Sequence, residues 1–229
     1  MKSFFSVVAV LFFSIAFSQG NVDYRGDNIK YAVIKQNNEI KGKDYIYDEW
    51  NRGMLVLNDS IFSKQDYLKY DAHKNRVLIK RNKEVIEITD RTLTGFSIIE
   101  KESNLKHDFV KLKRFNFKGE EETGFYEIVY NIQNTNYFIK KNAKIVFDPN
   151  RSKGSQTENN FPLKFQDKTS YYIKNSEGLY VKVRLNKKGI KNNLTKHSKL
   201  INSFVKANKI KFNKESDVIK LVNYYYSLD

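Results

Sequence analysis

Short runs in which apolar and polar residues alternate, separated by polar turns, fill the chain up to about Leu185. A period of two is typical of strands that bury one face and expose the other. We therefore predict strands over residues 53–57, 67–70, 76–80, 84–88, 95–99, 109–115, 125–132, 137–147, 169–174 and 179–185.

The last two of these ranges form the clearest hairpin. They flank Asn175-Ser176-Glu177-Gly178, whose residue types favour a four-residue loop. In the second strand the apolar positions 179, 181, 183 and 185 alternate with Tyr180, Lys182 and Arg184. This alternation predicts an antiparallel sheet with one packed face and one face in water, the latter carrying Tyr180.

From Asn186 the apolar spacing changes to three and four residues, which is typical of helices. A short segment with Ile190 and Leu194 comes first, and a helix that we expect Thr195 to cap follows. The apolar face of that helix consists of Leu200, Ile201, Phe204 and Val205. A last helix begins near Asn213, and its apolar stripe consists of Val218, Ile219, Leu221, Val222 and Tyr225.

Each of these helices hides one apolar stripe and needs a sheet to cover it. The sequence therefore predicts an α+β fold that is mainly β, with antiparallel sheets and C-terminal helices packed on one face. We expect residues 19–229 to form a single domain, β-rich over residues 30–185 and helical over residues 186–229.

Residues 1–18 have the layout of a secretory signal peptide. A short positive start precedes an apolar run from Phe4 to Phe17, and the small residues Ala16 and Ser18 stand before a cleavage site at Gln19. The run has fourteen residues, fewer than the roughly 20 that cross a bilayer as a helix. No later segment predicts a transmembrane span. We therefore expect an exported, soluble protein that is periplasmic, associated with the outer membrane or secreted.

The composition is that of a globular protein, with 40% apolar and 14% aromatic residues. The chain contains no cysteine. This absence excludes a disulfide framework, a thiolate metal site and a cysteine nucleophile. It also excludes the acylated cysteine by which bacterial lipoproteins are anchored.

The net charge of +15 is unevenly distributed, since residues 178–214 contain eleven Lys or Arg and no Asp or Glu. Such a block can hold a polyanion, for example lipopolysaccharide, nucleic acid or an anionic membrane surface. The candidate polyanion surface consists of Lys187, Lys188, Lys191 and Lys196. The alternative is a solvating basic surface, which the excess of lysine over arginine favours because arginine suits bidentate phosphate recognition better.

Tyr45, Tyr47 and Trp50 form a second candidate surface. Two tyrosines two residues apart share a face of an extended segment, and the only tryptophan follows nearby. Aromatic rings with polar edges suit sugar rings or a protein partner. The alternative is that the three rings fill the core or a sheet edge.

Catalytic chemistry has little support in the sequence. The three histidines, His73, His107 and His197, lack the spacing of a helical zinc pair, and we expect them at the surface or in turns. Nucleophile elbows and glycine-rich phosphate loops are absent from the sequence. The sequence therefore predicts no catalytic, cofactor-binding or metal-ligating residue, and no cofactor.

Three segments carry a resemblance to known proteins: Asp48-Glu49-Trp50 leading into residues 53–58, the hairpin 171–185, and the ending 219–225. With these segments the chain resembles a group of secreted proteins of Bacteroidota whose function is not established. The resemblance implies an envelope location and transfers no functional residue. Asp59-Ser60-Ile61 also matches the acceptor pattern for O-glycosylation of exported proteins in that phylum.

Three functions follow as hypotheses. The first is a non-enzymatic binding or structural module of the envelope, whose partner is an envelope protein, a glycan or an anionic polymer. The second is a hydrolase acting on cell-wall or extracellular polymers. The third is a polyanion binder that uses residues 178–214.

Overall fold

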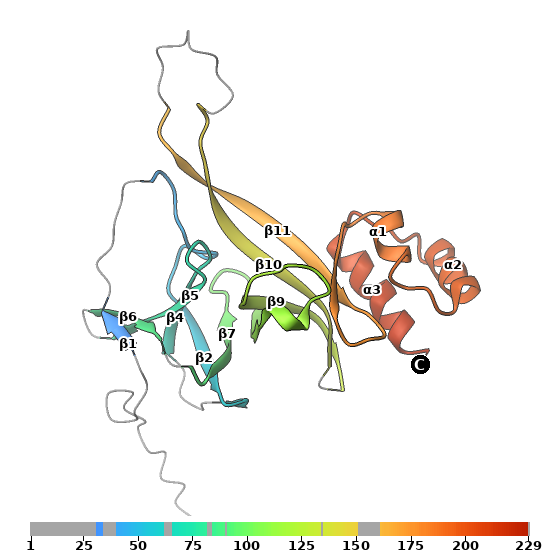
Figure 1. Cartoon of the computed structure of the whole chain (residues 1–229), viewed down its shortest axis with the longest axis horizontal. Coiled ribbons are helices and arrows are strands. Elements are labelled where there is room, and N and C mark those ends of the chain that lie inside the picture. Colours follow the sequence, from blue (N-terminus) through green and yellow to red (C-terminus); the bar gives the residue numbers. More distant parts are fainter. Residues whose placement is uncertain are drawn as a thin grey trace, which may run out of the picture.

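The computed structural model describes residues 31–33, 40–61, 66–81, 84–89, 91–133, 135–150 and 161–228, and Figure 1 shows their arrangement. The strands are β1 (Tyr31–Val33), β2 (Asn51–Leu57), β3 (Ser60–Ile61), β4 (Asp66–Asp71), β5 (Arg76–Arg81), β6 (Glu84–Ile88), β7 (Leu93–Ile99), β8 (Lys106–Leu112), β9 (Gly124–Ile132), β10 (Thr135–Phe147), β11 (Lys164–Lys174) and β12 (Tyr180–Val183). The helices are the 3-10 helix η1 (Arg114–Asn116) and the α-helices α1 (Lys187–Lys191), α2 (Ser198–Ala207) and α3 (Glu215–Tyr226). The predicted signal peptide, residues 1–18, lies outside the described residues.

The described strands join in one antiparallel sheet, in the order β1-β6-β5-β4-β2-β7-β8-β9-β10-β11-β12, with β3 paired to β2 alone. From β7 to β12 each strand pairs with the next one along the chain. β2 departs from this simple meander because it lies between β4 and β7. The structure thus confirms the predicted mainly β, antiparallel fold.

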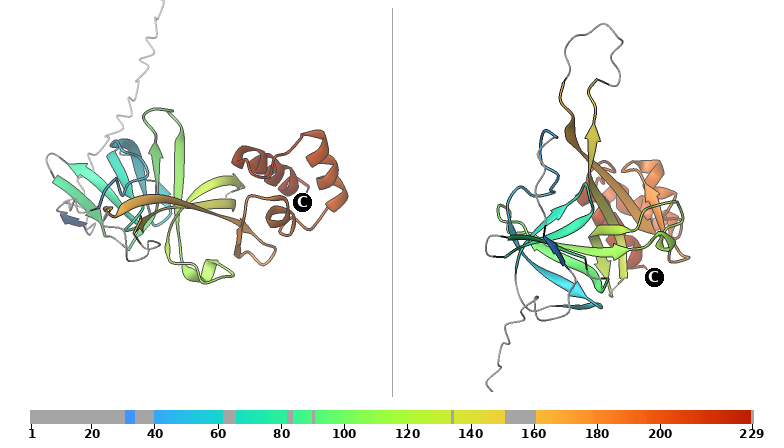
Figure 2. Two further views of the ribbon diagram at one scale, coloured as in Figure 1. Left: turned by 90° about the horizontal axis from the view of Figure 1, so that it is seen from above. Right: turned by 60° about the vertical axis from the view of Figure 1, so that its left-hand side comes forward.

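The C-terminal helices pack against the sheet at the end opposite β1, as Figure 1 and the left view of Figure 2 show. Their contact joins Phe138 of β10 and Ile173 of β11 to the apolar sides of α2 and α3. The buried helix residues in this contact are Ile201, Val218, Leu221, Val222 and Tyr225. Within the described part of the chain, none of the helices is long and apolar enough to span a membrane.

The start of α2 differs from the prediction that Thr195 caps it. The N-cap is His197, two residues later, with a left-handed backbone (φ 53°) and no capping side-chain hydrogen bond. The backbone carbonyl of His197 accepts the first helical bond from the N–H of Ile201, at 3.0 Å. The left-handed turn at His197 therefore sets the start of the helix, and Thr195 stays outside it.

Two apolar cores lie on the same face of the sheet, with a polar strip between them. In β9, Phe125, Glu127 and Val129 share that face because alternate residues of a strand point the same way. Phe125 belongs to the core of β2 and β4–β8, whereas Val129 packs on the core beneath the helices. Glu127 stands between the two and is only 6% exposed.

The opposite face of the sheet carries a third, smaller core, which corrects two predictions. Tyr180, predicted to face water, is 3% exposed because Phe117 covers it, with ring centroids 5.5 Å apart. The strand predicted over residues 109–115 ends at Leu112, and the chain turns through η1. Phe115 is consequently 71% exposed.

The distal parts of β10 and β11 form a ribbon that projects from the rest of the molecule (Figures 1 and 2). Pairing of β10 with β9 stops at Lys140, while pairing with β11 continues to Phe147. Five of the nine exposed large apolar side chains in the described residues lie at the far end of this ribbon: Ile145, Val146, Phe147, Phe161 and Leu163. The ribbon also approaches residue 41, which forms a bridge with Lys164.

Candidate functional site

A surface hollow, here called the loop groove, has a volume of about 880 Å³. It lies where the β9–β10 turn, the β11–β12 loop, the α1–α2 connection and the end of α3 meet. Its lining consists of Lys118, Ile132, Gln133, Thr135, Tyr137, Lys174, Asn175, Ser176, Glu177, Gly178, Val181, Asn192, Asn193, Thr195, Lys196, Tyr225 and Tyr226. The volume falls within the roughly 300–1,000 Å³ that ligand pockets usually have.

The β11–β12 loop is held rigidly by Asn175. Its side-chain oxygen accepts hydrogen bonds from the backbone N–H groups of Glu177 (3.0 Å) and Leu179 (2.9 Å). The backbone N–H of Asn175 donates to the backbone carbonyl of Leu179 at 2.8 Å. Gly178 completes the turn with φ +79°, a conformation that L side chains rarely adopt. The predicted hairpin is thus confirmed, and it forms one wall of the groove.

Two tyrosines from distant parts of the chain form an aromatic wall. The rings of Tyr137 in β10 and Tyr226 in α3 stack with centroids 3.8 Å apart. The Tyr226 hydroxyl donates to the backbone carbonyl of Lys174 at 2.7 Å, which fixes the helix end to the strand end. The stacked pair therefore presents a preformed surface to the groove.

The charge of the groove lining is mainly positive. Among the described lining residues, Lys118, Lys174 and Lys196 are basic and Glu177 is the one carboxylate. The Lys118 ammonium lies 3.9 Å from that carboxylate. The Lys174 ammonium lies over the ring of Tyr180, 5.1 Å from its centroid, and burial lowers the pKa of Lys174 below its ordinary value.

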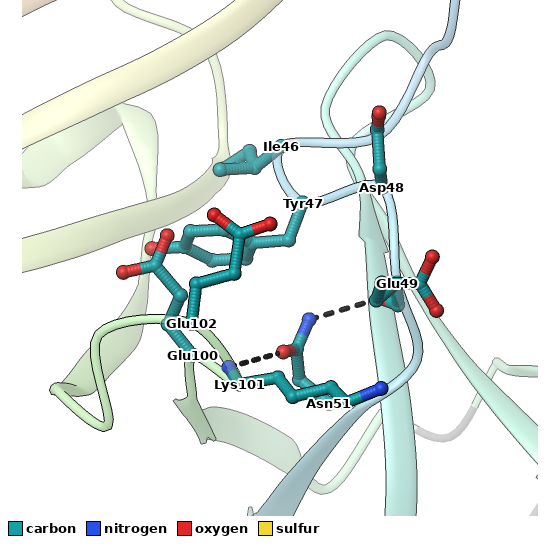
Figure 3. Close-up of a pocket in the computed structure, with 8 residues that line it drawn as sticks. All are labelled: Ile46, Tyr47, Asp48, Glu49, Asn51, Glu100, Lys101 and Glu102. Carbon is teal, nitrogen blue, oxygen red and sulfur yellow. Dashed lines mark hydrogen bonds between the residues drawn. The ribbon is translucent and has the colours of Figure 1, made fainter.

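A second hollow, here called the acidic pocket, has a volume of about 330 Å³ (Figure 3). It is lined by Ile46, Tyr47, Asp48, Glu49, Asn51, Glu100, Lys101 and Glu102. The buried side chain of Asn51 holds its two sides together. It donates to the carbonyl of Glu49 and accepts from the N–H of Lys101, both at 2.9 Å.

The carboxylates of the acidic pocket do not converge on one point. In Figure 3, Glu100 and Glu102 reach toward the Tyr47 ring, whereas Asp48 and Glu49 point away from it. Asp48 is paired instead with Lys43 at 2.7 Å, and this hydrogen bond lowers the pKa of Asp48. An arrangement of this kind does not match a pair of carboxylates set on either side of a scissile bond.

A polar network begins behind the acidic pocket at Glu127. One carboxylate oxygen of Glu127 lies 2.8 Å from Nδ1 of His107, and the other accepts from the Asn142 amide at 2.6 Å. Lys140 lies 3.3 Å from the same carboxylate. The network continues to α3, since Lys140 lies 3.0 Å from Glu215, which also accepts from the Tyr171 hydroxyl at 2.8 Å.

These contacts set the charges of the network. Burial raises the pKa of Glu127, but the hydrogen bond from His107 and the charge of Lys140 outweigh burial, so the net pKa is lowered. The hydrogen bond to Glu127 raises the pKa of His107, against the opposing effect of burial. The network is therefore a chain of paired charges that joins the sheet to the last helix.

We expect the stability of the protein to fall as the pH rises from 6.5 through the raised folded-state pKa of His107. His107 has a folded-state pKa above its ordinary value of 6.5, so its contribution is complete below that value and disappears as the pH rises through the folded-state pKa. The groups facing its ring are Glu127, Glu100, Lys140 and Tyr47. Urea unfolding from pH 5 to pH 9 measures this loss, and His107→Gln is expected to flatten it. An unchanged slope in the variant would assign the pH dependence to other groups.

His107 is the exception among the three histidines. His73 is exposed in the β4–β5 turn and His197 is exposed at the start of α2, as predicted. The side chain of His107 is only 20% exposed and takes part in the network, so the prediction of a surface position is wrong for it. Among the described residues, no group of three or more His, Asp or Glu could hold a metal ion.

The structure separates the three aromatic residues that the sequence grouped together. Tyr45 and Trp50 both lie against Lys69, whose ammonium is 4.5 Å and 5.4 Å from their ring centroids. Tyr47 faces His107 instead, with ring centroids 5.4 Å apart. The segment bends rather than running extended, and all three rings are half-buried. A binding role for these residues stays a prediction.

The four lysines predicted to bind a polyanion lie in different surroundings. Lys187 and Lys188 are exposed on α1, and Lys191 donates a hydrogen bond to the Asn202 side chain. Lys196 lines the loop groove. Sequence reasoning missed the remaining groove residues, because only the loop around Asn175 carries a local signal, and that signal indicates a turn rather than a site.

The chain matches no protein-family model, no curated protein and no solved structure. The residues and their geometry therefore support the function proposed below without the help of a relative.

Proposed function

We propose that the protein is a non-enzymatic binding module that takes a segment of a hydroxyl-rich polymer, such as an envelope glycan, in the loop groove. One observation carries this proposal: amides, hydroxyls and a stacked tyrosine pair line a single groove of about 880 Å³. Tyrosine rings pack against the apolar faces of sugars, while amide groups both donate to and accept from sugar hydroxyls.

The charge pattern of the groove favours binding over hydrolysis. Glycosidases use two carboxylates flanking the scissile bond, and Glu177 is the single carboxylate among the described groove-lining residues. The proposed export of the chain, which rests on residues 1–18, would bring the groove into contact with envelope and extracellular polymers. The proposed export and the proposed class of ligand are therefore consistent with each other.

We expect Tyr137→Ala to weaken oligosaccharide binding by about tenfold or more, equal to about 1.4 kcal/mol. The substitution removes one ring of the aromatic wall, which stands 3.8 Å from its partner ring. Isothermal titration of the mature chain with oligomers of N-acetylglucosamine, of glucose and of galacturonate measures the affinity. Chromatography of the saccharides after the titration reveals hydrolysis, because a hydrolase would release shorter products.

Tyr67→Ala serves as the matched control, since Tyr67 is 53% exposed on β4 and does not line the groove. We expect this variant to bind like the wild type. Failure of all three saccharides to bind the wild type would reject the proposal, and so would equal binding by wild type and Tyr137→Ala.

Binding of a polyanion over the basic C-terminal part is the second candidate function. The observation that favours it is the exposure of Lys187 and Lys188 within a stretch of eleven basic residues that has no acid. Exposed charges act through long-range attraction that salt screens. Heparin affinity that collapses at high salt, and in the combined Lys187→Gln and Lys188→Gln variant, would support this function instead.

A further inference from the structure

Lys174 differs from the half-buried lysines of the neighbouring strand β10. On β10, Lys140, Lys141 and Lys144 are 16–17% exposed, and each lies within 3.4 Å of a carboxylate oxygen. Lys174, at the end of β11, has no carboxylate partner among the described residues, and its ammonium rests over the Tyr180 ring. It thus differs from its neighbours in lacking a counter-charge.

Lys174, which lacks a carboxylate partner among the described residues, lies at the loop groove. Lys174 lines the groove, and its carbonyl holds the Tyr226 hydroxyl beside the aromatic wall. The single described carboxylate of the groove, Glu177, lies on the side of Lys118. A half-buried ammonium without a counter-ion is unfavourable, and an anion that enters the groove would relieve this cost.

We propose that the polymer bound in the loop groove is acidic, and that Lys174 receives its carboxylate or phosphate group. This inference rests on the proposed function, whose ligand class it narrows. Lys118 and Lys196 add positive charge to the same groove. The lowered pKa of Lys174, which burial causes, agrees with a cation that lacks a partner in the free protein.

Two probes that share one sugar chain and differ at the carboxyl group test the inference: a charged oligogalacturonate and its uncharged, fully methyl-esterified form. We expect the mature wild-type chain to bind the acid at least about tenfold more tightly than the ester, because the acid alone forms a charge-assisted hydrogen bond with the ammonium. Lys174→Gln should lose this preference and bind the acid and the ester about equally. The preference should also shrink in about 1 M salt, where the Debye length is about 3 Å.

Lys80→Gln is the control, because it removes the same charge at an exposed position on β5 outside the groove lining. We expect it to retain the preference. A phosphorylated mannan fragment and its dephosphorylated form repeat the comparison and show whether phosphate or carboxylate is preferred.

The outcomes separate the two proposals. If acid and ester bind equally, or if Lys174→Gln keeps the full preference, the inference fails while the proposed saccharide site stands. If no saccharide binds the wild type, the proposed function fails, and the inference fails with it.

Discussion

Replacing Glu127 with alanine is expected to lower the free energy of unfolding by about 3–5 kcal/mol. The carboxylate is 6% exposed and stands between the two cores on one face of the sheet. Its removal leaves the His107 ring and the Asn142 amide, now 2.8 Å and 2.6 Å from it, without their partner. A buried polar group that loses its hydrogen-bond partner destabilises the folded state, because water cannot reach it to take the place of the partner. Urea unfolding at neutral pH measures the change.

Two further variants show whether the unpaired partners cause this loss. Glu102→Ala truncates the same side chain at an exposed site on the acidic pocket, and we expect a change within about 0.5 kcal/mol. The double variant Glu127→Met with His107→Leu removes both side chains of the hydrogen bond between Glu127 and His107. It should be more stable than Glu127→Ala, since replacing a buried pair with apolar groups is often neutral. Lower stability in the double variant would contradict this account.

Replacing Gly53 with alanine is expected to destabilise the protein by about 3 kcal/mol. Gly53 lies in β2, where the sheet is closely packed on both sides of the strand. A Cβ atom there would lie 2.2 Å from the carbonyl oxygen of Ser97 and 2.6 Å from Cδ1 of Leu68. Because the nearer atom belongs to the backbone of β7, relief requires a shift of the strand itself. Thermal and urea unfolding both measure the loss.

The control for Gly53→Ala is the same substitution at Gly119, where no atom lies within 4 Å of the added Cβ. We expect Gly119→Ala to change stability by no more than about 0.5 kcal/mol. Equal effects at the two glycines would show that backbone flexibility, rather than steric contact, decides the outcome.

Alternation and turn residues predicted those parts of the fold that neighbouring residues determine. The range 84–88 was predicted as it is observed, and the hairpin at Asn175 was found from its turn residues. The patterns failed where a distant segment decides burial. Phe117 covers Tyr180 from a position far away in sequence, and nothing in the alternation of one strand shows that its second face is also covered.

The candidate site was less accessible to sequence reasoning than the fold. Of its charged residues, the sequence singled out Lys196 because of its basic neighbours, whereas Lys174 lies in a strand beside ordinary alternating residues. The pairing of Tyr137 with Tyr226 depends on α3 docking against the sheet. The network around Glu127 was missed for a similar reason, since its members come from four strands and a helix.

The place of β2 in the sheet governs the order in which the chain can assemble. β2 needs a partner far along the chain, as the pairing of Arg52 with Ile99 shows, whereas each hairpin from β7 to β12 joins neighbouring strands. Short loops close at a lower entropic cost than long ones, so local hairpins form first. A chain delivered amino end first would hold β2 with one open edge until residues 93–99 arrive. That edge is where premature association between nascent copies would begin.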